Sequence, residues 1–254
     1  MVSAQAKVDS SGKYSPEEWE VRVALAACYR LAVHFKMTDI TLTHLTARVP
    51  GPDSHFLINP YGLMFHEVCA SNLIKIDLDG NMMEESEWPV NQAGYVIHSA
   101  VHRAHEHLHC VVHNHTLAGV AVSAQKDGLL PISQHSMQFY NRVSYHDYEG
   151  PAQDTAECER IIADLGENKA MILRNHGLLT AGESIPEAFG LMVQLDKACQ
   201  IQVAAQSGGE LVMPKLEVRE HSGEVFADSR RRFEGAFWNA LLRLIADQEE
   251  DYSR

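Results

Sequence analysis

The sequence lacks any long hydrophobic run. No apolar stretch in the 254 residues approaches the roughly 20 that a membrane-spanning helix needs. The first 14 residues, MVSAQAKVDSSGKY, contain no apolar core of the kind found in signal peptides. We therefore expect a cytoplasmic protein that has no membrane partner.

Paired cysteines and clustered basic residues are also scarce. The five cysteines are scattered and form no C-x-x-C pair, so we expect small buried side chains rather than disulfides or a zinc knuckle. They are Cys28, Cys69, Cys110, Cys158 and Cys199. A formal net charge of −13 argues against a nucleic-acid partner, because phosphate binding requires clustered Lys and Arg. The one basic cluster, Arg230-Arg231-Arg232, is expected to be a solvated face.

Helix and strand patterns alternate along the chain. The segment Ser15-Pro16-Glu17-Glu18 and the pair Ser184 and Glu187 have the spacing of a capping box, as do Asp154 and Glu157. We predict helices over 15–36, 91–105, 154–166 and 184–206, and a last amphipathic helix that carries Phe233, Phe237 and Leu241. We predict strands over 41–49, 55–58, 73–78, 110–113, 129–132, 142–146 and 169–173.

This interleaving, with no repeat and no low-complexity linker, predicts one three-layer α/β domain over residues 15–206. Residues 1–14 are polar and are expected to form a mobile tail. Residues 207–254 are expected to form a C-terminal arm or helix. Its apolar face must be buried, either on its own domain or against another subunit.

Histidine is unusually frequent, and nine of the fifteen histidines lie between His98 and His146. In His113-Asn114-His115 the two imidazoles are two residues apart, so on a strand both would point to the same side. His176 follows another apolar run, 170–173. If the two strands are neighbours, three imidazoles meet, and three protein ligands with one open position are typical of catalytic metal sites. The alternative is two unrelated loop histidines.

Three more histidines, His98, His102 and His105, share one stripe of the predicted helix 91–105. Their density could suggest a second metal site. We expect instead a polar, solvated helix face. The sequence contains no P-loop, no G-x-G-x-x-G and no serine–histidine nucleophile pattern.

Five stretches of the chain resemble the class II aldolase/adducin family, in family order. They are residues 43–48 (THLTAR), 56–62 (FLINPYG), 75–80 (KIDLDG), 111–115 (VVHNH) and 173–177 (LRNHG). Residues 128–133, 145–148 and 182–188 are more similar to the adducin head than to the sugar-phosphate aldolases. The resemblance implies an α/β/α sandwich with a mostly antiparallel central sheet, a homotetramer, and one divalent transition metal, zinc or iron, on His113, His115 and His176.

The sequence departs from the sugar-phosphate aldolases at several positions. Gly94 stands where the resemblance implies a glutamate that binds the metal and acts as acid/base, and we expect it to leave room for a larger substrate. Gln92 and Ala93 replace the serines that grip phosphate, and Thr43-His44 replaces a Gly-Asn pair. These departures argue against a sugar-phosphate aldolase.

The resemblance therefore implies a metal-dependent enzyme that cleaves a carbon–carbon bond in a non-phosphorylated oxo or hydroxy acid, in the manner of an aldolase or decarboxylase. One alternative is a non-haem iron oxygenase that decarboxylates an aromatic 2-oxo or 2-hydroxy acid. The other is a non-catalytic scaffold like the adducin head. Candidate acid/base residues are His146, Asp147 or a tyrosine. Candidate substrate-binding residues are Thr43, His44, Asn59, Gly62, Gln92 and Gly94.

Overall fold

The computed structural model describes residues 12–150 and 155–254. Most of the expected tail, residues 1–14, therefore lies outside the described residues. Tyr14 is among the described residues, and it packs on the domain. Its ring stacks on Trp19 with 5.7 Å between centroids, and its hydroxyl donates to Glu84 at 3.1 Å. The tail prediction was wrong for Tyr14.

A seven-stranded sheet forms the centre of the molecule, in the order β3-β2-β1-β4-β7-β6-β5. The strands are β1 His44–Arg48, β2 Phe56–Ile58, β3 Ile74–Ile76, β4 Cys110–Asn114, β5 Ser144–His146, β6 Ala170–Leu173 and β7 Gly177–Gly182. Every neighbouring pair is antiparallel except β5 and β6, which run parallel. The expected mostly antiparallel sheet is confirmed.

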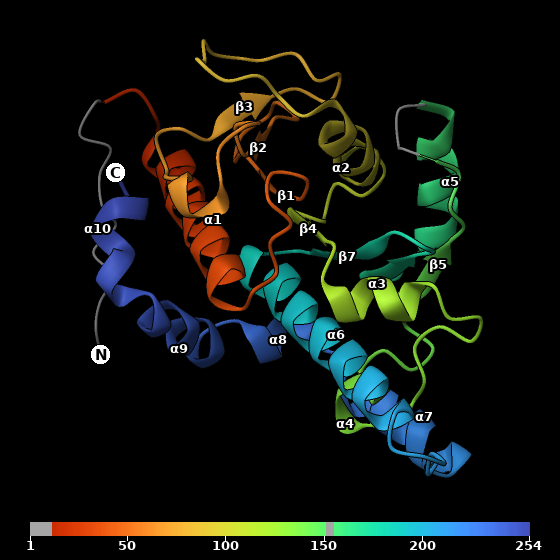
Figure 1. The fold of residues 1–254 in the computed structure, drawn as a ribbon. Coiled ribbons are helices and arrows are strands. Elements are labelled where there is room, and N and C mark those ends of the chain that lie inside the picture. The colour runs from red at the N-terminus through yellow and green to blue at the C-terminus, as the bar shows by residue number, and fades with distance from the viewer. Residues whose placement is uncertain (1–11, 151–154) are drawn as a thin grey trace.

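Helices cover both faces of this sheet (Figure 1). On one face lie α1 (Pro16–His34), α3 (Leu117–Ser123) and α6 (Ile185–Gln206), which share a core with Val112 of β4. On the other face lie α2 (Gln92–Ala104) and α5 (Thr155–Leu165), which pack against Val111 of the same strand. Alternating residues of β4 thus enter opposite cores. The expected three-layer α/β/α sandwich is confirmed.

Two of the predicted helix starts are confirmed. The hydroxyl of Ser15 accepts from the backbone N–H of Glu18 at 3.2 Å, and that of Ser184 accepts from Glu187 at 3.4 Å. The glutamates do not close the capping boxes, because Glu18 pairs with Arg22 at 2.9 Å and the carboxylate of Glu187 accepts from the backbone N–H of Glu183 at 2.8 Å. Asp154, the third predicted cap, lies outside the described residues.

The prediction of a strand at 129–132 was wrong. The backbone N–H groups there donate to side chains: that of Leu129 to the hydroxyl of Tyr145 at 3.0 Å, and that of Leu130 to Gln202 at 2.7 Å. Strand β7, by contrast, was not predicted. Its sequence, GLLTAG, is buried on both faces and so has no polar alternation that would reveal it.

The C-terminal segment forms four short helices rather than one: α7 Leu216–Val225, α8 Ser229–Phe233, α9 Ala236–Leu244 and α10 Glu249–Tyr252. Short pieces complete the fold, namely α4 Gln134–Met137, η1 Phe65–Glu67 and η2 Ala246–Gln248. Phe233 is buried against Gly190 of α6, and Leu241 joins the main core. Much of the expected apolar face is therefore covered by its own domain, and a subunit contact stays a prediction. Within the described ranges, no helix is both long and apolar enough to cross a membrane.

Candidate metal centre

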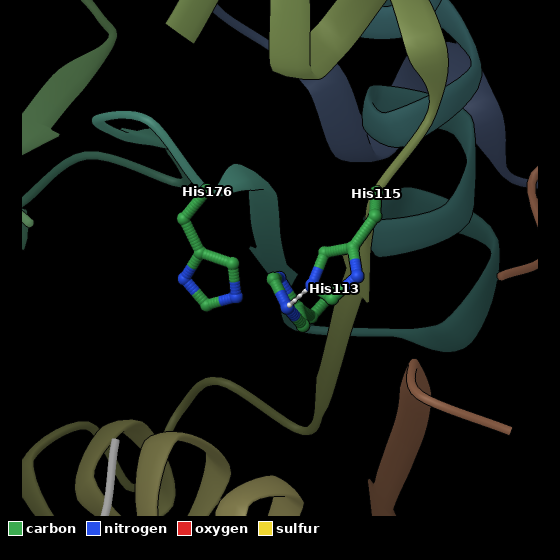
Figure 2. Close-up of side chains that lie close together, drawn as sticks. All are labelled: His113, His115 and His176. Carbon is green, nitrogen blue, oxygen red and sulfur yellow. Dashed lines mark hydrogen bonds between the residues drawn. The ribbon is translucent and has the colours of Figure 1, made fainter. Parts of the chain in front are cut away.

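His113 and His115 lie at the end of β4, with their rings on one side of the sheet as the two-residue spacing predicts. His176 lies in the turn between β6 and β7, and Figure 2 shows its ring facing the other two. The two strands that lead to these histidines, β4 and β6, are not direct neighbours, because β7 lies between them. The three imidazoles still meet, since β7 pairs with both strands and brings the turn to the end of β4.

The segment Asn175-His176-Gly177 has the residues that this turn requires. Asn175 adopts a φ of 56°, in the left-handed region that asparagine tolerates better than most residues. A Cβ at Gly177 would lie 2.4 Å from the carbonyl oxygen of Asn114, so only glycine allows β7 to approach β4 this closely. His176 is held between these two constraints.

Hydrogen bonds fix the tautomers of the two histidines on β4. The Nδ1–H of His113 donates to the carbonyl oxygen of Leu178 at 2.9 Å, and the Nδ1–H of His115 donates to Asp39 at 3.0 Å. Neither oxygen carries a hydrogen, so in each neutral ring Nε2 keeps its lone pair. These two Nε2 atoms are 2.9 Å apart, the contact drawn as a dashed line in Figure 2. Two facing lone pairs repel each other unless a cation lies beside them.

The donor set fits a divalent transition metal. One ring nitrogen from each of His113, His115 and His176 lies within 4.8 Å of the others. Burial, with a smaller contribution from neighbouring imidazoles, lowers the pKa of His113 well below its usual value and lowers that of His176 to about 4. These two rings, those of His113 and His176, are thus held neutral, which is the form that binds metal. Carboxylate–histidine contacts such as Asp39–His115 are the usual outer support of such sites.

His44 occupies the space beside Gly94. A Cβ built on Gly94 would lie 2.3 Å from Cδ2 of His44 and 2.7 Å from its Nε2. The expectation that Gly94 leaves room for a larger substrate was wrong for this reason, because the imidazole of His44 already fills that space. Glycine at this position on α2 is required by the packing of a buried ring.

We predict that Gly94→Ala lowers the free energy of unfolding by about 1–3 kcal/mol, the usual cost of overpacking a core. His44→Ala should relieve the overlap, so the double variant should lose less than the two single losses combined. Urea unfolding of the four proteins measures this coupling. Additive losses would show that the two residues do not compete for space.

The expected solvated stripe on α2 was also wrong for two of its residues. His98 and His102 are fully buried, and only His105 is partly exposed. The hydroxyl of Thr46 lies 2.7 Å from Nδ1 of His98 and 2.9 Å from Nε2 of His102. Helical spacing predicts that the histidines share a face but not which face points inward.

The other predicted substrate-binding residues lie in different surroundings. Asn59 is buried, and its side-chain oxygen accepts from the hydroxyl of Tyr29 at 3.0 Å. Gly62 has a φ of 105° and faces the ring of Trp88. Thr43 is buried, with no hydrogen-bond partner for its hydroxyl within the described part. The Gln92 side chain lies outside the described residues. A substrate role for these residues stays a prediction.

The predicted acid/base residues lie at the end of β5, beside the histidine cluster: His146 is its last residue and Asp147 follows it. His146 is buried, with Nδ1 2.7 Å from Asp164 and Nε2 3.6 Å from Glu157. Asp147 is exposed. Both residues line a small cavity of about 10 Å³ that His176 also lines. The structure thus brings them next to one metal-ligand candidate, and their catalytic role stays a prediction.

Asp39 was missed by sequence reasoning. It lies in the loop between α1 and β1, far along the chain from the histidines that it supports, and no motif surrounds it. A histidine that binds a metal usually donates its second ring N–H to an acceptor, so a residue such as Asp39 is expected on chemical grounds. This rule does not say where in the sequence the acceptor lies.

Comparisons with known proteins agree with this architecture. The profile of the Class II Aldolase and Adducin N-terminal domain matches residues 23–203. An aldolase II superfamily protein from Pseudomonas syringae has a structure with a TM-score of 0.90 and 52% identity, covering 95% of this chain and 98% of that one. An L-fuculose 1-phosphate aldolase from Glaciozyma antarctica has a TM-score of 0.81 and 27% identity, covering 98% of both chains.

The adducins are similar to this chain over a shorter region. Alpha-adducin of Rattus norvegicus is 45% identical over 201 residues, which make up 77% of this chain and 27% of the adducin. The match with the family profile spans well over half of the chain and includes all three histidines. The chain therefore belongs to the class II aldolase and adducin family.

Proposed function

We propose that this protein is a metal-dependent lyase that cleaves a carbon–carbon bond in a non-phosphorylated oxo or hydroxy acid. The observation that carries the proposal is the cluster of His113, His115 and His176, two of them fixed in the tautomer that presents Nε2. A divalent metal held there would act as a Lewis acid and stabilise negative charge on a substrate oxygen. Three protein ligands leave a coordination position free for that substrate.

The surrounding residues support this chemistry in distinct ways. Asp39 and the carbonyl of Leu178 hold the rings of His115 and His113 in orientation, so that little reorganisation is needed when a ligand arrives. His146, paired with Asp164 beside His176, is our candidate to move a proton.

We predict that the protein does not cleave ketose 1-phosphates and does cleave 4-hydroxy-2-oxo acids, which carry the β-hydroxy carbonyl that a retro-aldol step requires. The reason is that Gln92 and Ala93 replace the hydroxyls that would hold a phosphate. Pyruvate or aldehyde release, followed for both substrate classes with the same preparation, tests this. Robust cleavage of a ketose phosphate would overturn the substrate assignment.

The similarity to alpha-adducin supports a second candidate, a non-catalytic scaffold. The two functions differ in what they require of the histidines, since a scaffold needs no metal. Elemental analysis of protein purified without added metal or a histidine tag separates them. Zinc supports the lyase, iron supports the oxygenase alternative, and no metal supports the scaffold. The homotetramer and the cytoplasmic location stay predictions, and light scattering measures the former.

A further inference from the structure

His44 lies next to the proposed metal centre without belonging to its three ligands. It begins β1, and its backbone is the register partner of His113 on β4, so both side chains point to the same face of the sheet. The two rings stack with 5.5 Å between centroids and 25° between planes. His44 keeps 3% of its surface exposed, and its ring fills the space beside Gly94.

A chain of hydrogen bonds connects His44 to a backbone carbonyl through three buried side chains. His102 Nδ1 lies 3.3 Å from the carbonyl oxygen of Leu108, which can only accept, so that nitrogen carries the ring hydrogen. His102 Nε2 must then accept from the hydroxyl of Thr46 at 2.9 Å. Because that hydroxyl donates its only hydrogen to His102, it can only accept from His98, whose Nδ1–H lies 2.7 Å away.

The same assignment of donors and acceptors determines the tautomer of His44. With its hydrogen on Nδ1, His98 has only a lone pair on Nε2, and this atom lies 3.2 Å from Nδ1 of His44. Nδ1 of His44 must therefore donate, which leaves Nε2 of His44 as a hydrogen-bond acceptor. Thr46 and His98 are 0% exposed and His102 is 1% exposed, so water has little access to these side chains and cannot readily replace any of their hydrogen bonds. The carbonyl of Leu108 thus sets the tautomer of a ring four groups away.

We propose that Nε2 of His44 accepts a hydrogen bond from a hydroxyl group of the substrate, and that Thr46 is the positioning residue that holds this acceptor in its tautomer. The inference rests on the proposed function, because it concerns the same metal centre. It narrows the substrate class to acids that carry a free hydroxyl group within reach of His44, in preference to ethers of the same shape. Gly94 contributes to this arrangement because its lack of a side chain leaves space for the imidazole ring of His44.

The test uses the full-length protein loaded with Co²⁺, whose visible absorption reports ligand binding. Glycolate and methoxyacetate are the probes, because they have similar shapes and only glycolate has the hydroxyl hydrogen. The wild-type protein should prefer glycolate, and His44→Phe should lower that preference by about tenfold, the usual weight of one hydrogen bond. Co²⁺ binding with an unchanged preference in His44→Phe would overturn the role of His44 alone.

Variants of Thr46 give a second measurement that does not depend on bound metal. In ¹⁵N NMR spectra of the metal-free protein, the His44 ring should carry its hydrogen on Nδ1 in the wild type and in Thr46→Ser. Thr46→Val removes the hydroxyl, so the tautomers of His44 should mix and the preference for glycolate should fall. The same tautomer in all three proteins would overturn the relay. Failure of the wild-type protein to take up Co²⁺ would overturn the proposed function and the role of His44 with it.

Discussion

Replacement of His113 by alanine is expected to lower the affinity for a divalent metal by more than about 100-fold, and His176→Ala is expected to do the same. Outer-shell partners already contribute about 10–100-fold, so loss of a ligand should cost more than Asp39→Asn. The reason is geometric: two imidazoles in fixed tautomers remain too few to hold the ion against water. Chelator competition, followed by elemental analysis, measures the affinity of each variant.

His105→Ala is the matched control, since His105 follows the last residue of α2 and is not part of the proposed site. It should retain wild-type metal content. Circular dichroism confirms that each variant is folded, so a lost metal is not mistaken for a lost fold. Metal retained at wild-type affinity after loss of both His113 and His176 would place the site elsewhere.

The metal-free protein is expected to lose stability steeply as the pH falls below about 6.5, the ordinary pKa of histidine. Burial lowers the pKa of His44 and of His102 to about 3, and lowers that of His98 well below its usual value. The unfolded chain therefore binds protons that the folded chain excludes between pH 6.5 and about 3. Stability is fully present above this window and is lost as the pH falls through it.

The three rings together should lower the free energy of unfolding by about 4 kcal/mol for each pH unit below the start of that window. Urea unfolding at several pH values, with chelator present, measures the slope. His102→Phe should reduce the slope by about 1.4 kcal/mol per pH unit, the share of one proton, whereas the same change at the exposed His107 is the control. Equal slopes in the wild type and His102→Phe would show that His102 is charged in the folded state.

The sequence was sufficient for the elements whose signal is local. The histidine pair on β4 could be predicted because spacing fixes the side on which residues of a strand lie, and the starts of α1 and α6 could be predicted from Ser15 and Ser184. Strand β7 could not, because a strand buried on both faces has no alternating pattern.

The parts of the site that were missed depend on packing between distant segments. That His98 points inward is decided by β1, which supplies Thr46 as its partner. The space beside Gly94 could not be judged from the helix alone, because the ring that fills it belongs to another layer. Asp39 reaches His115 across 76 positions of sequence. Chemical rules predict that a buried histidine needs a hydrogen-bond partner. Only the fold determines which residue is that partner.

The three candidate ligands come from two places in the chain, the end of β4 and the turn before β7, and this has a thermodynamic consequence. An ion bound by His115 and His176 would be a removable cross-link that closes a long loop of chain. Like other cross-links, it would restrict the unfolded ensemble through loop-closure entropy. Because unfolding must release the ion, its binding free energy becomes folding free energy. The stability of the fold would then depend on the concentration of free metal. At a free metal concentration one hundred times the dissociation constant, bound metal would raise the free energy of unfolding by about 2.7 kcal/mol.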